Sequence, residues 1–196
     1  MLKKILIASS ILAVTSGIAA ANPAPYVGAS IGITANTSSS AAYGKNVTGG
    51  VSTTLSSPAN YRGVPFSVFA GYGGVISENF YLAGELSGTV ATADISNNNG
   101  LKTSYGYGAS VIPGVMLSDH TLAFARAGVV RSNFSNANST QTGGQFGLGL
   151  QTSVTQNVDV RGEYDFTAYR SLNNSIGRVD SPRSDAFNLG LVYKFD

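Results

Sequence analysis

The feature that most constrains the fold is an alternation of apolar and polar residues that recurs along almost the whole chain. In residues 144–154, alternate positions such as Phe146 and Leu148 are apolar, and those between them are Gly, Gln or Ser. A period of two is the pattern of a β-strand with two unlike faces. Beyond residue 21, no stretch has the length and periodicity of a membrane-spanning or amphipathic helix. The pattern therefore predicts an all-β fold.

Eight segments follow this alternation, separated by clusters of Gly, Asn, Ser and Asp. Their ranges are 26–34, 64–76, 80–92, 101–117, 122–131, 144–154, 158–169 and 185–195. Short gaps alternate with long ones. The short gaps are 76–80, 118–121 and 155–157, and the long ones are 35–63, 93–100, 133–143 and 170–184. Short turns at one end and long loops at the other are typical of an antiparallel up-and-down transmembrane barrel.

The apolar faces fit either of two architectures. In a soluble sandwich or barrel they fill the core, whereas in an outer-membrane barrel they face lipid. The chain is 43% hydrophobic and only 11% charged, against a charged share of about 25% in soluble proteins. The polar faces are rich in Gly, Ser and Gln, and most segments reach the roughly 9–11 residues that cross a bilayer. We therefore favour lipid outside, with a soluble secreted barrel as the alternative.

Aromatic residues on the apolar faces gather at two heights, as expected at the two membrane–water interfaces. The group near the long loops is Phe66, Tyr105, Tyr107, Phe146, Phe166 and Phe187, and the group near the short turns is Tyr72, Phe80, Tyr193 and Phe195. Three charged residues fall at positions of the apolar face, but they lie near strand ends: Arg62, Arg131 and Asp185. A charge at mid-bilayer would cost about 2–4 kcal/mol.

The first residues have the pattern of a secretory signal peptide. Lys3 and Lys4 precede an apolar run, and three alanines end at Ala21. This predicts a signal peptide over residues 1–21 and a barrel domain over 22–196. Without the signal, ten basic and ten acidic residues are left, which gives no electrostatic basis for binding nucleic acid. The chain has no Cys, so no disulfide framework holds it together.

One irregularity interrupts the fourth segment. Pro113 has no N–H to donate to a neighbouring strand, and Gly114 follows it. We expect a β-bulge at this dipeptide. The alternation alone then leaves the facing of Val115 to Leu117 undetermined.

The end of the chain carries a more specific signal. The pattern Asn188-x-Gly190-x-x-Tyr193-x-Phe195 resembles the C-terminal β-signal of small outer-membrane β-barrel proteins, the porin family related to the OmpA transmembrane domain and the opacity-type surface proteins. Asp196 after the aromatic residue departs from that signal. The segment VIPGVMLSDHTLAFARAGV, residues 111–129, is similar to a stretch of the same family.

This resemblance implies an integral outer-membrane protein of a Gram-negative bacterium. Its partners would be outer-membrane lipids and lipopolysaccharide, together with periplasmic chaperones and the barrel-assembly machinery during biogenesis. The peptidoglycan-binding domain of classical OmpA has no counterpart here, so anchoring to the cell wall is not expected.

Charged residues on the inward faces are the first candidate site. They are Glu85, Lys102, Arg126, Asp159, Arg161, Glu163 and Asp165. An eight-stranded barrel is only wide enough for its own side chains, and a lone buried ion is costly. We therefore expect these charges to pair. A packed plug of salt bridges is favoured, and a gated narrow ion path is the alternative.

An enzymatic role finds little support in the sequence. Lipid hydrolysis at a barrel surface needs a nucleophile with a nearby base. The single histidine, His120, falls in a predicted periplasmic turn. We expect no enzyme activity, no cofactor and no metal.

The long gaps suggest contacts at the cell surface. Residues 35–60 are nearly uncharged and rich in Ser, Thr, Gly and Asn, which predicts a solvated, flexible loop. Arg170, Arg178 and Arg183 in the last gap are candidates for contacts with lipopolysaccharide phosphates, although solubility explains them equally well. By resemblance, such loops mediate adhesion or host contacts. The predicted function is structural and surface-interactive, with a narrow porin-like channel as the alternative.

Overall fold

The computed structural model describes residues 23–43, 54–98, 102–134, 139–170, 172–174 and 177–195. The predicted signal peptide lies outside these residues. In the described part of the chain the strands are β1 (Ala24–Tyr43), β2 (Thr54–Ser77), β3 (Phe80–Asn98), β4 (Thr103–Ser118), β5 (Thr121–Phe134), β6 (Ser139–Ser153), β7 (Val158–Tyr169), β8 (Leu172–Asn174) and β9 (Gly177–Lys194). No helix among these residues has the length and apolar character to span a membrane.

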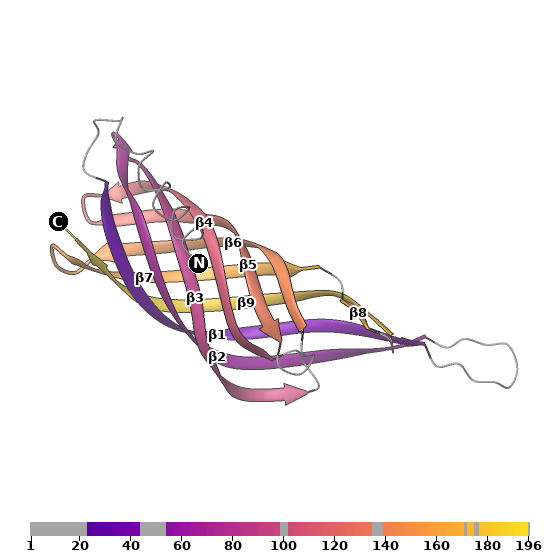
Figure 1. Cartoon of the computed structure of the whole chain (residues 1–196). Helices are drawn as coiled ribbons and strands as arrows, with labels where there is room; N and C mark the ends of the chain where they lie inside the picture. The colour runs from indigo at the N-terminus through magenta and orange to yellow at the C-terminus, as the bar shows by residue number, and fades with distance from the viewer. Residues whose placement is uncertain are drawn as a thin grey trace, which may run out of the picture.

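The strands form one closed antiparallel barrel (Figure 1). Each long strand pairs with its neighbour in the order β1 to β7 and then β9, and β1 pairs with β9 to close the cylinder. The three-residue β8 pairs only with the start of β9. The predicted eight-stranded up-and-down barrel is therefore confirmed. Closure leaves no sheet edge within the barrel wall, so every strand there has partners on both sides.

The two faces of the wall separate as the alternation predicts. On the outside, large apolar side chains stand exposed, for example Leu86 at 67% and Leu191 at 59%. On the inside, Ile112 and Val192 are almost fully buried, at 0% and 1%. Such an exterior is stable only against hydrocarbon, because monomeric soluble proteins rarely expose apolar patches of this extent.

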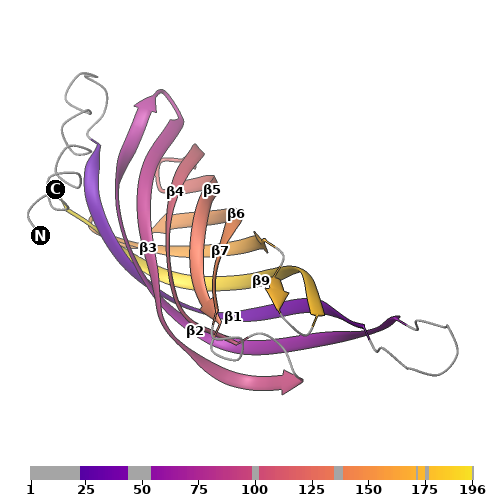
Figure 2. The same ribbon diagram turned by 45° about the vertical axis from the view of Figure 1, so that its right-hand side comes forward.

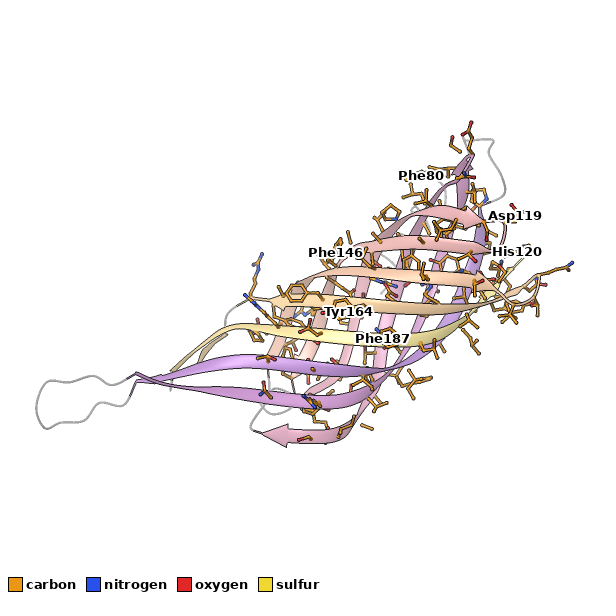
Figure 3. All side chains as sticks on the ribbon, turned by 180° about the vertical axis from the view of Figure 1, so that it is seen from behind. Phe80, Asp119, His120, Phe146, Tyr164 and Phe187 are labelled. Carbon is orange, nitrogen blue, oxygen red and sulfur yellow. The ribbon has the colours of Figure 1, made fainter. Side chains whose placement is uncertain are left out.

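Exposed aromatic residues mark the two ends of the apolar band. Figure 3 shows Phe146 and Phe187 on the outer surface, well away from Phe80 beside the short turns. Tyr193 and Phe195 pack edge to face near the turns, with ring centroids 5.1 Å apart. Phe66, Tyr105 and Tyr107 complete the exposed set near the long connections, whereas Phe166 and Tyr72 are half-buried. The end with short turns is called the turn side below, and the other end the loop side.

The strands reach further on the loop side than the sequence pattern predicted. β1 continues to Tyr43 and β2 begins at Thr54, so much of the expected flexible loop at 35–60 is paired strand, and residues 44–53 lie outside the described part. The expected loops at 93–100, 133–143 and 170–184 are shortened in the same way. The prediction ended each strand where apolar alternation stops. Beyond the membrane no apolar face is needed, and pairing with neighbouring strands alone continues the strand.

The expected bulge at Pro113 and Gly114 is absent. Leu82↔Pro113 and Tyr81↔Gly114 follow one another in β3–β4 without a shift. On the β5 side, Val111↔Ala127 and Gly114↔Phe124 keep a single register. Alternation therefore runs through the dipeptide, and Val115 and Leu117 face lipid with 50% and 65% exposure. On the β5 side residues 112–113 are not paired, which accommodates the missing N–H of proline without an inserted residue.

Candidate functional site in the barrel lumen

Three strands bring five charged side chains together inside the barrel. Arg161, Glu163 and Asp165 alternate along β7 and so point to one face. Glu85 comes from β3 and Arg126 from β5. Each of the five is between 3% and 6% exposed. We call Glu85, Arg126, Arg161, Glu163 and Asp165 the lumen network.

Arg126 connects both sides of this network. Its Nη2 donates to Glu85 Oε1 at 2.7 Å and to Glu163 Oε2 at 3.0 Å. Its Nε donates to Glu163 Oε1, and Nη1 donates to Ser110 Oγ at 2.8 Å. The guanidinium therefore grips Glu163 with two parallel hydrogen bonds, the geometry that makes arginine–carboxylate pairs strong. This arrangement offsets much of the cost of burying the charges.

Glu85 is shared between the two arginines. Its Oε2 accepts from Arg161 Nη1 at 2.6 Å and from the Tyr26 hydroxyl at 3.0 Å. Arg161 Nε donates to Gln151 Oε1 at 2.8 Å. One carboxylate thus links β3 to three other strands, β1, β5 and β7, and each of its oxygens is hydrogen-bonded.

Three aromatic rings surround Arg161. The rings of Tyr26, Phe69 and Phe124 have centroids 5.6, 4.8 and 5.1 Å from the guanidinium carbon. A cation within about 6 Å of a ring centroid is attracted by the ring. We call Tyr26, Phe69 and Phe124 the aromatic cage. It closes the lumen on the turn side of the network.

Glycines on neighbouring strands leave space for these rings, because a Cβ at each would overlap a ring atom. The pairs are Tyr26 over Gly71, Phe69 over Gly28 and Phe124 over Gly149. The cage was not predicted from the sequence. Two features of the sequence could have indicated it. These aromatic residues occupy the polar positions of the alternation, whereas the lipid-facing aromatics occupy the apolar positions. The neighbouring strands also carry glycine at the positions that face the rings.

A second polar group continues from Arg161 toward the turn side. Gln151 Nε2 donates to Asp159 Oδ2 at 2.6 Å, and Lys194 Nζ lies 2.9 Å from Asp159 Oδ1. These side chains line a cavity of about 380 Å³ that also contacts His120. Asp159 is therefore joined to the lumen network through Gln151, and its own charge is balanced by Lys194.

On the loop side the lumen is lined mainly by hydroxyl groups. A cavity of about 120 Å³ lies above the network, and we call it the upper cavity. Ser67 Oγ and Thr89 Oγ1, on adjacent strands of its wall, are hydrogen-bonded at 3.1 Å. Asp165 reaches into it from the network, and Asn188 Nδ2 donates to Asp165 Oδ2 at 3.0 Å.

Lys102 is the predicted lumen charge that the structure places elsewhere. Its Nζ pairs with Asp94 at 2.7 Å, and the Tyr61 hydroxyl donates to the same carboxylate at 2.6 Å. In the β2–β3 register Asp94 lies opposite Gly63, which is further toward the loop side than Phe66. The hydrogen bond from Lys102, followed by that from Tyr61, lowers the pKa of Asp94 below its usual value.

The remaining predicted residues lie apart from the lumen network, except Asn188, which contacts Asp165. Gly190 is buried, whereas Tyr193 and Phe195 are exposed on the outside. Arg170 and Arg183 are exposed on the loop side. Arg178 belongs to β9, but its side chain lies outside the described part.

The turn between β4 and β5 contains Asp119 and His120, both exposed (Figure 3). Within the described residues, no group of three or more His, Cys, Asp or Glu side chains could hold a metal ion. The described lumen residues make ion pairs, hydrogen bonds and cation–π contacts.

The sequence matches the family described as "Outer membrane protein beta-barrel domain" over residues 5–195. No curated protein matches it. Among solved structures, Neisserial surface protein A (NspA) is 19% identical with a TM-score of 0.49, covering 87% of this chain and 97% of that one. Ail, the attachment invasion locus protein of Yersinia pestis, is 13% identical with a TM-score of 0.41, covering 88% and 99%. The outer membrane protease OmpT from Escherichia coli is 7% identical with a TM-score of 0.47, covering 90% and 99%.

The family match spans nearly the whole chain. It agrees with the closed antiparallel barrel and with its apolar exterior. The chain therefore belongs to the outer membrane protein β-barrel domain family and is an integral β-barrel of the bacterial outer membrane.

Proposed function

We propose that this barrel serves at the cell surface, where its loop side makes contacts with the surroundings while the wall contributes to outer-membrane integrity. One observation carries the proposal. β1, β2 and β9 continue as paired strands well beyond the aromatic residues that mark the edge of the apolar band.

The extension is long relative to what the membrane requires. β1 has 20 residues and β2 has 24, whereas about 9–11 cross a bilayer. Their pairing runs without a shift from Ala24↔Gly73 to Tyr43↔Thr54. β9 follows β1 as far as Ala42↔Gly177, with one irregularity. Figure 2 shows the β1–β2 hairpin projecting past the other strands. A binding segment on such a paired scaffold is already positioned for a partner.

The composition of this projection indicates the kind of contact. Residues 35–60 contain a single charged residue, Lys45, and many Ser, Thr and Asn. A neutral surface of this kind binds through hydrogen bonds rather than through long-range charge attraction. We propose a host or surface ligand of neutral, hydrogen-bonding character.

Exposed arginines on the loop side support a second contact, with lipopolysaccharide. Arg170 and Arg183 are exposed there, as are Arg62 and Arg131. Arg131 lies directly across from Tyr107, one of the exposed aromatics on the loop side. A guanidinium can grip a phosphate with two hydrogen bonds. We propose that these side chains contact lipid phosphates of the outer leaflet.

The surface proposal is tested by replacing residues 44–53 with a short Gly-Ser turn, which retains the paired parts of β1 and β2. We expect expressing cells to lose attachment to cultured epithelial cells. Heat-dependent gel mobility would show that the barrel is intact, and surface labelling would show that it is exported. The matched control replaces residues 135–138 in the same way. Unchanged attachment after the first replacement would refute the adhesion role.

A narrow channel is the alternative function, and one observation favours it. Cavities of about 120 and 380 Å³ lie on the two sides of the lumen network. Between them the aromatic cage and the ion pairs fill the lumen, so we expect wild type to show no stable current in planar bilayers and Arg126→Ala to leak. Porin-sized currents in wild type would overturn the plugged interpretation.

We also propose that the protein is not an enzyme. His120 lies in an exposed turn, on the side opposite to the lipopolysaccharide leaflet. Incubation with labelled lipopolysaccharide followed by mass spectrometry should show no deacylated product, and a product would refute this expectation.

A further inference from the structure

The lumen network carries more negative than positive charge. It contains two guanidinium groups, from Arg126 and Arg161, against the three carboxylates of Glu85, Glu163 and Asp165. The neighbouring Asp159 does not alter this balance, because Lys194 neutralises it. One negative charge is therefore left over inside the barrel wall. An uncompensated buried charge is strongly unfavourable.

The excess charge is located at Asp165, because its ion pair is the longest of those that the three carboxylates make. This residue is 6% exposed. Its Oδ2 accepts from Asn188, but its Oδ1 has no hydrogen-bond partner. The nearest guanidinium nitrogen, Arg126 Nε, lies 3.6 Å from Oδ1 and already donates to Glu163.

A second carboxylate oxygen lies near this one. Asp165 Oδ1 and Glu163 Oε1 both lie against Gly147, where a Cβ would overlap the aspartate oxygen and come within 3.2 Å of the glutamate oxygen. Two carboxylate oxygens this close repel each other unless a cation or a proton lies beside them. This end of the network therefore has the electrostatic character of a cation site.

The upper cavity supplies further ligands next to Asp165. Its volume of about 120 Å³ accommodates a small ion with a few waters, since a water occupies about 30 Å³ in the liquid. Eleven of the side chains that line it carry a hydroxyl group: ten are Ser or Thr, among them Ser67, Thr89 and Thr167, and one is Tyr169. Neutral oxygens and water beside one carboxylate suit a hard cation.

We propose that the upper cavity binds one partly hydrated alkali cation, Na⁺ or K⁺, beside Asp165 Oδ1. A single positive charge makes the network neutral. A divalent ion would leave it positive, and the described residues offer no cluster of three acidic, His or Cys ligands. The inference concerns the lumen and does not depend on the surface role proposed above.

The test compares thermal unfolding of the protein in neutral detergent micelles in NaCl, KCl and choline chloride at equal ionic strength. Choline has the same charge, but its methyl groups keep that charge from direct coordination by carboxylate or hydroxyl oxygens. We expect the midpoint in NaCl or KCl to exceed that in choline chloride by on the order of 5 °C at saturation. The variant Asp165→Asn should lose this difference. Asp94→Asn, which removes a carboxylate outside the cavity, should retain it.

Diffraction from crystals soaked in Rb⁺ or Tl⁺ provides an independent readout, with an anomalous peak expected beside Asp165. Equal midpoints in all three salts, with no peak, would overturn the proposal whether or not Asp165→Asn folds. A midpoint that depends on pH but not on the cation would show that a shared proton, and no metal ion, neutralises the network.

Discussion

The two halves of the lumen obey the same alternation of inward and outward residues, yet they are built differently. Next to the network on the turn side, the aromatic cage and its apolar neighbours Ile112 and Val192 form one buried cluster, and the cavity of about 380 Å³ borders the turn-side end of that cluster. On the loop side, hydroxyl groups line a cavity. The difference lies in which residues face one another across the strands. The rings of the cage lie over glycines in the first half, whereas ten Ser and Thr residues line the upper cavity in the second.

Alternation therefore determines which side chains point into the barrel, but it does not determine whether they fill the lumen. The lumen network lies at the boundary between the two halves, where Glu85 and Arg161 border the upper cavity and Arg161 also contacts the cage. Buried charges there are held by ion pairs on the packed side. On the open side, solvent or an ion can reach them.

The largest expected effect comes from breaking the network. Arg126→Ala removes the partner of Glu85 and Glu163 at once, and leaving buried carboxylates unpaired costs about 3–5 kcal/mol. We expect the free energy of unfolding to fall by that amount, measured by urea titration in micelles with heat-dependent gel mobility as the readout. Arg131→Ala, on the exposed face of the same strand, is the matched control and should change it little. Equal losses in both variants would contradict the internal role of Arg126.

A smaller effect is expected in the aromatic cage. Phe69→Leu retains an apolar side chain but removes a ring 4.8 Å from the Arg161 guanidinium. The loss of ring packing and of the cation–π contact should reduce stability by about 1–2 kcal/mol. Phe66→Leu, on the lipid face of the same strand, serves as the control in the same titration. If both variants are equally stable, the turn side of the lumen is not the tightly packed half.

Much of this organisation could be predicted from the sequence, because strand alternation fixes the facing of side chains. Alternation predicted the closed barrel and the apolar exterior, and it placed Glu85, Arg126 and Arg161 on inward faces. It did not predict the contacts among them, because contacts depend on the register between strands. The alternation pattern does not specify that register. Because the register was not known, Lys102 was grouped with the network, although its partner is Asp94.

Two other features were beyond the pattern for different reasons. The loop-side strands carry no apolar face, so the signal used to find strands disappears while backbone pairing continues to Tyr43. At Pro113, residue type suggested a bulge, but pairing with β3 continues through Pro113 and Gly114 without a shift. In both cases pairing between strands overrides local preference.

A still smaller effect concerns pH on the loop side. The pKa of Asp94 is lowered by hydrogen bonds from Lys102 and Tyr61. A carboxylate with a depressed folded-state pKa stabilises the fold above its unfolded-state pKa, and this stabilisation is lost as the pH falls through the folded-state value. Wild type should therefore lose stability on acidification in part through Asp94. Asp94→Asn should lose less between pH 7 and pH 3 in micelle titrations, whereas Asp119→Asn, in an exposed turn, should behave as wild type. An unchanged acid dependence in Asp94→Asn would show that the contact is not maintained in solution.

The smallest expected effect is in the upper cavity, and it separates the two halves most directly. Ser67→Ala removes one partner of a hydrogen bond of 3.1 Å to Thr89. In a dry, packed lumen the orphaned hydroxyl would cost about 1–3 kcal/mol. Beside a cavity of about 120 Å³, water can take the place of the lost hydroxyl, so we expect a loss below about 1 kcal/mol. The comparison variant is Ser110→Ala, because the Ser110 hydroxyl accepts a hydrogen bond from Arg126 in the network. Urea titration of the two variants compares the loss in free energy of unfolding in the two halves for the same substitution. A larger loss at Ser67 than at Ser110 would reverse the assignment of the packed and the solvated half, because only an unsatisfied hydroxyl in a closed space could produce it.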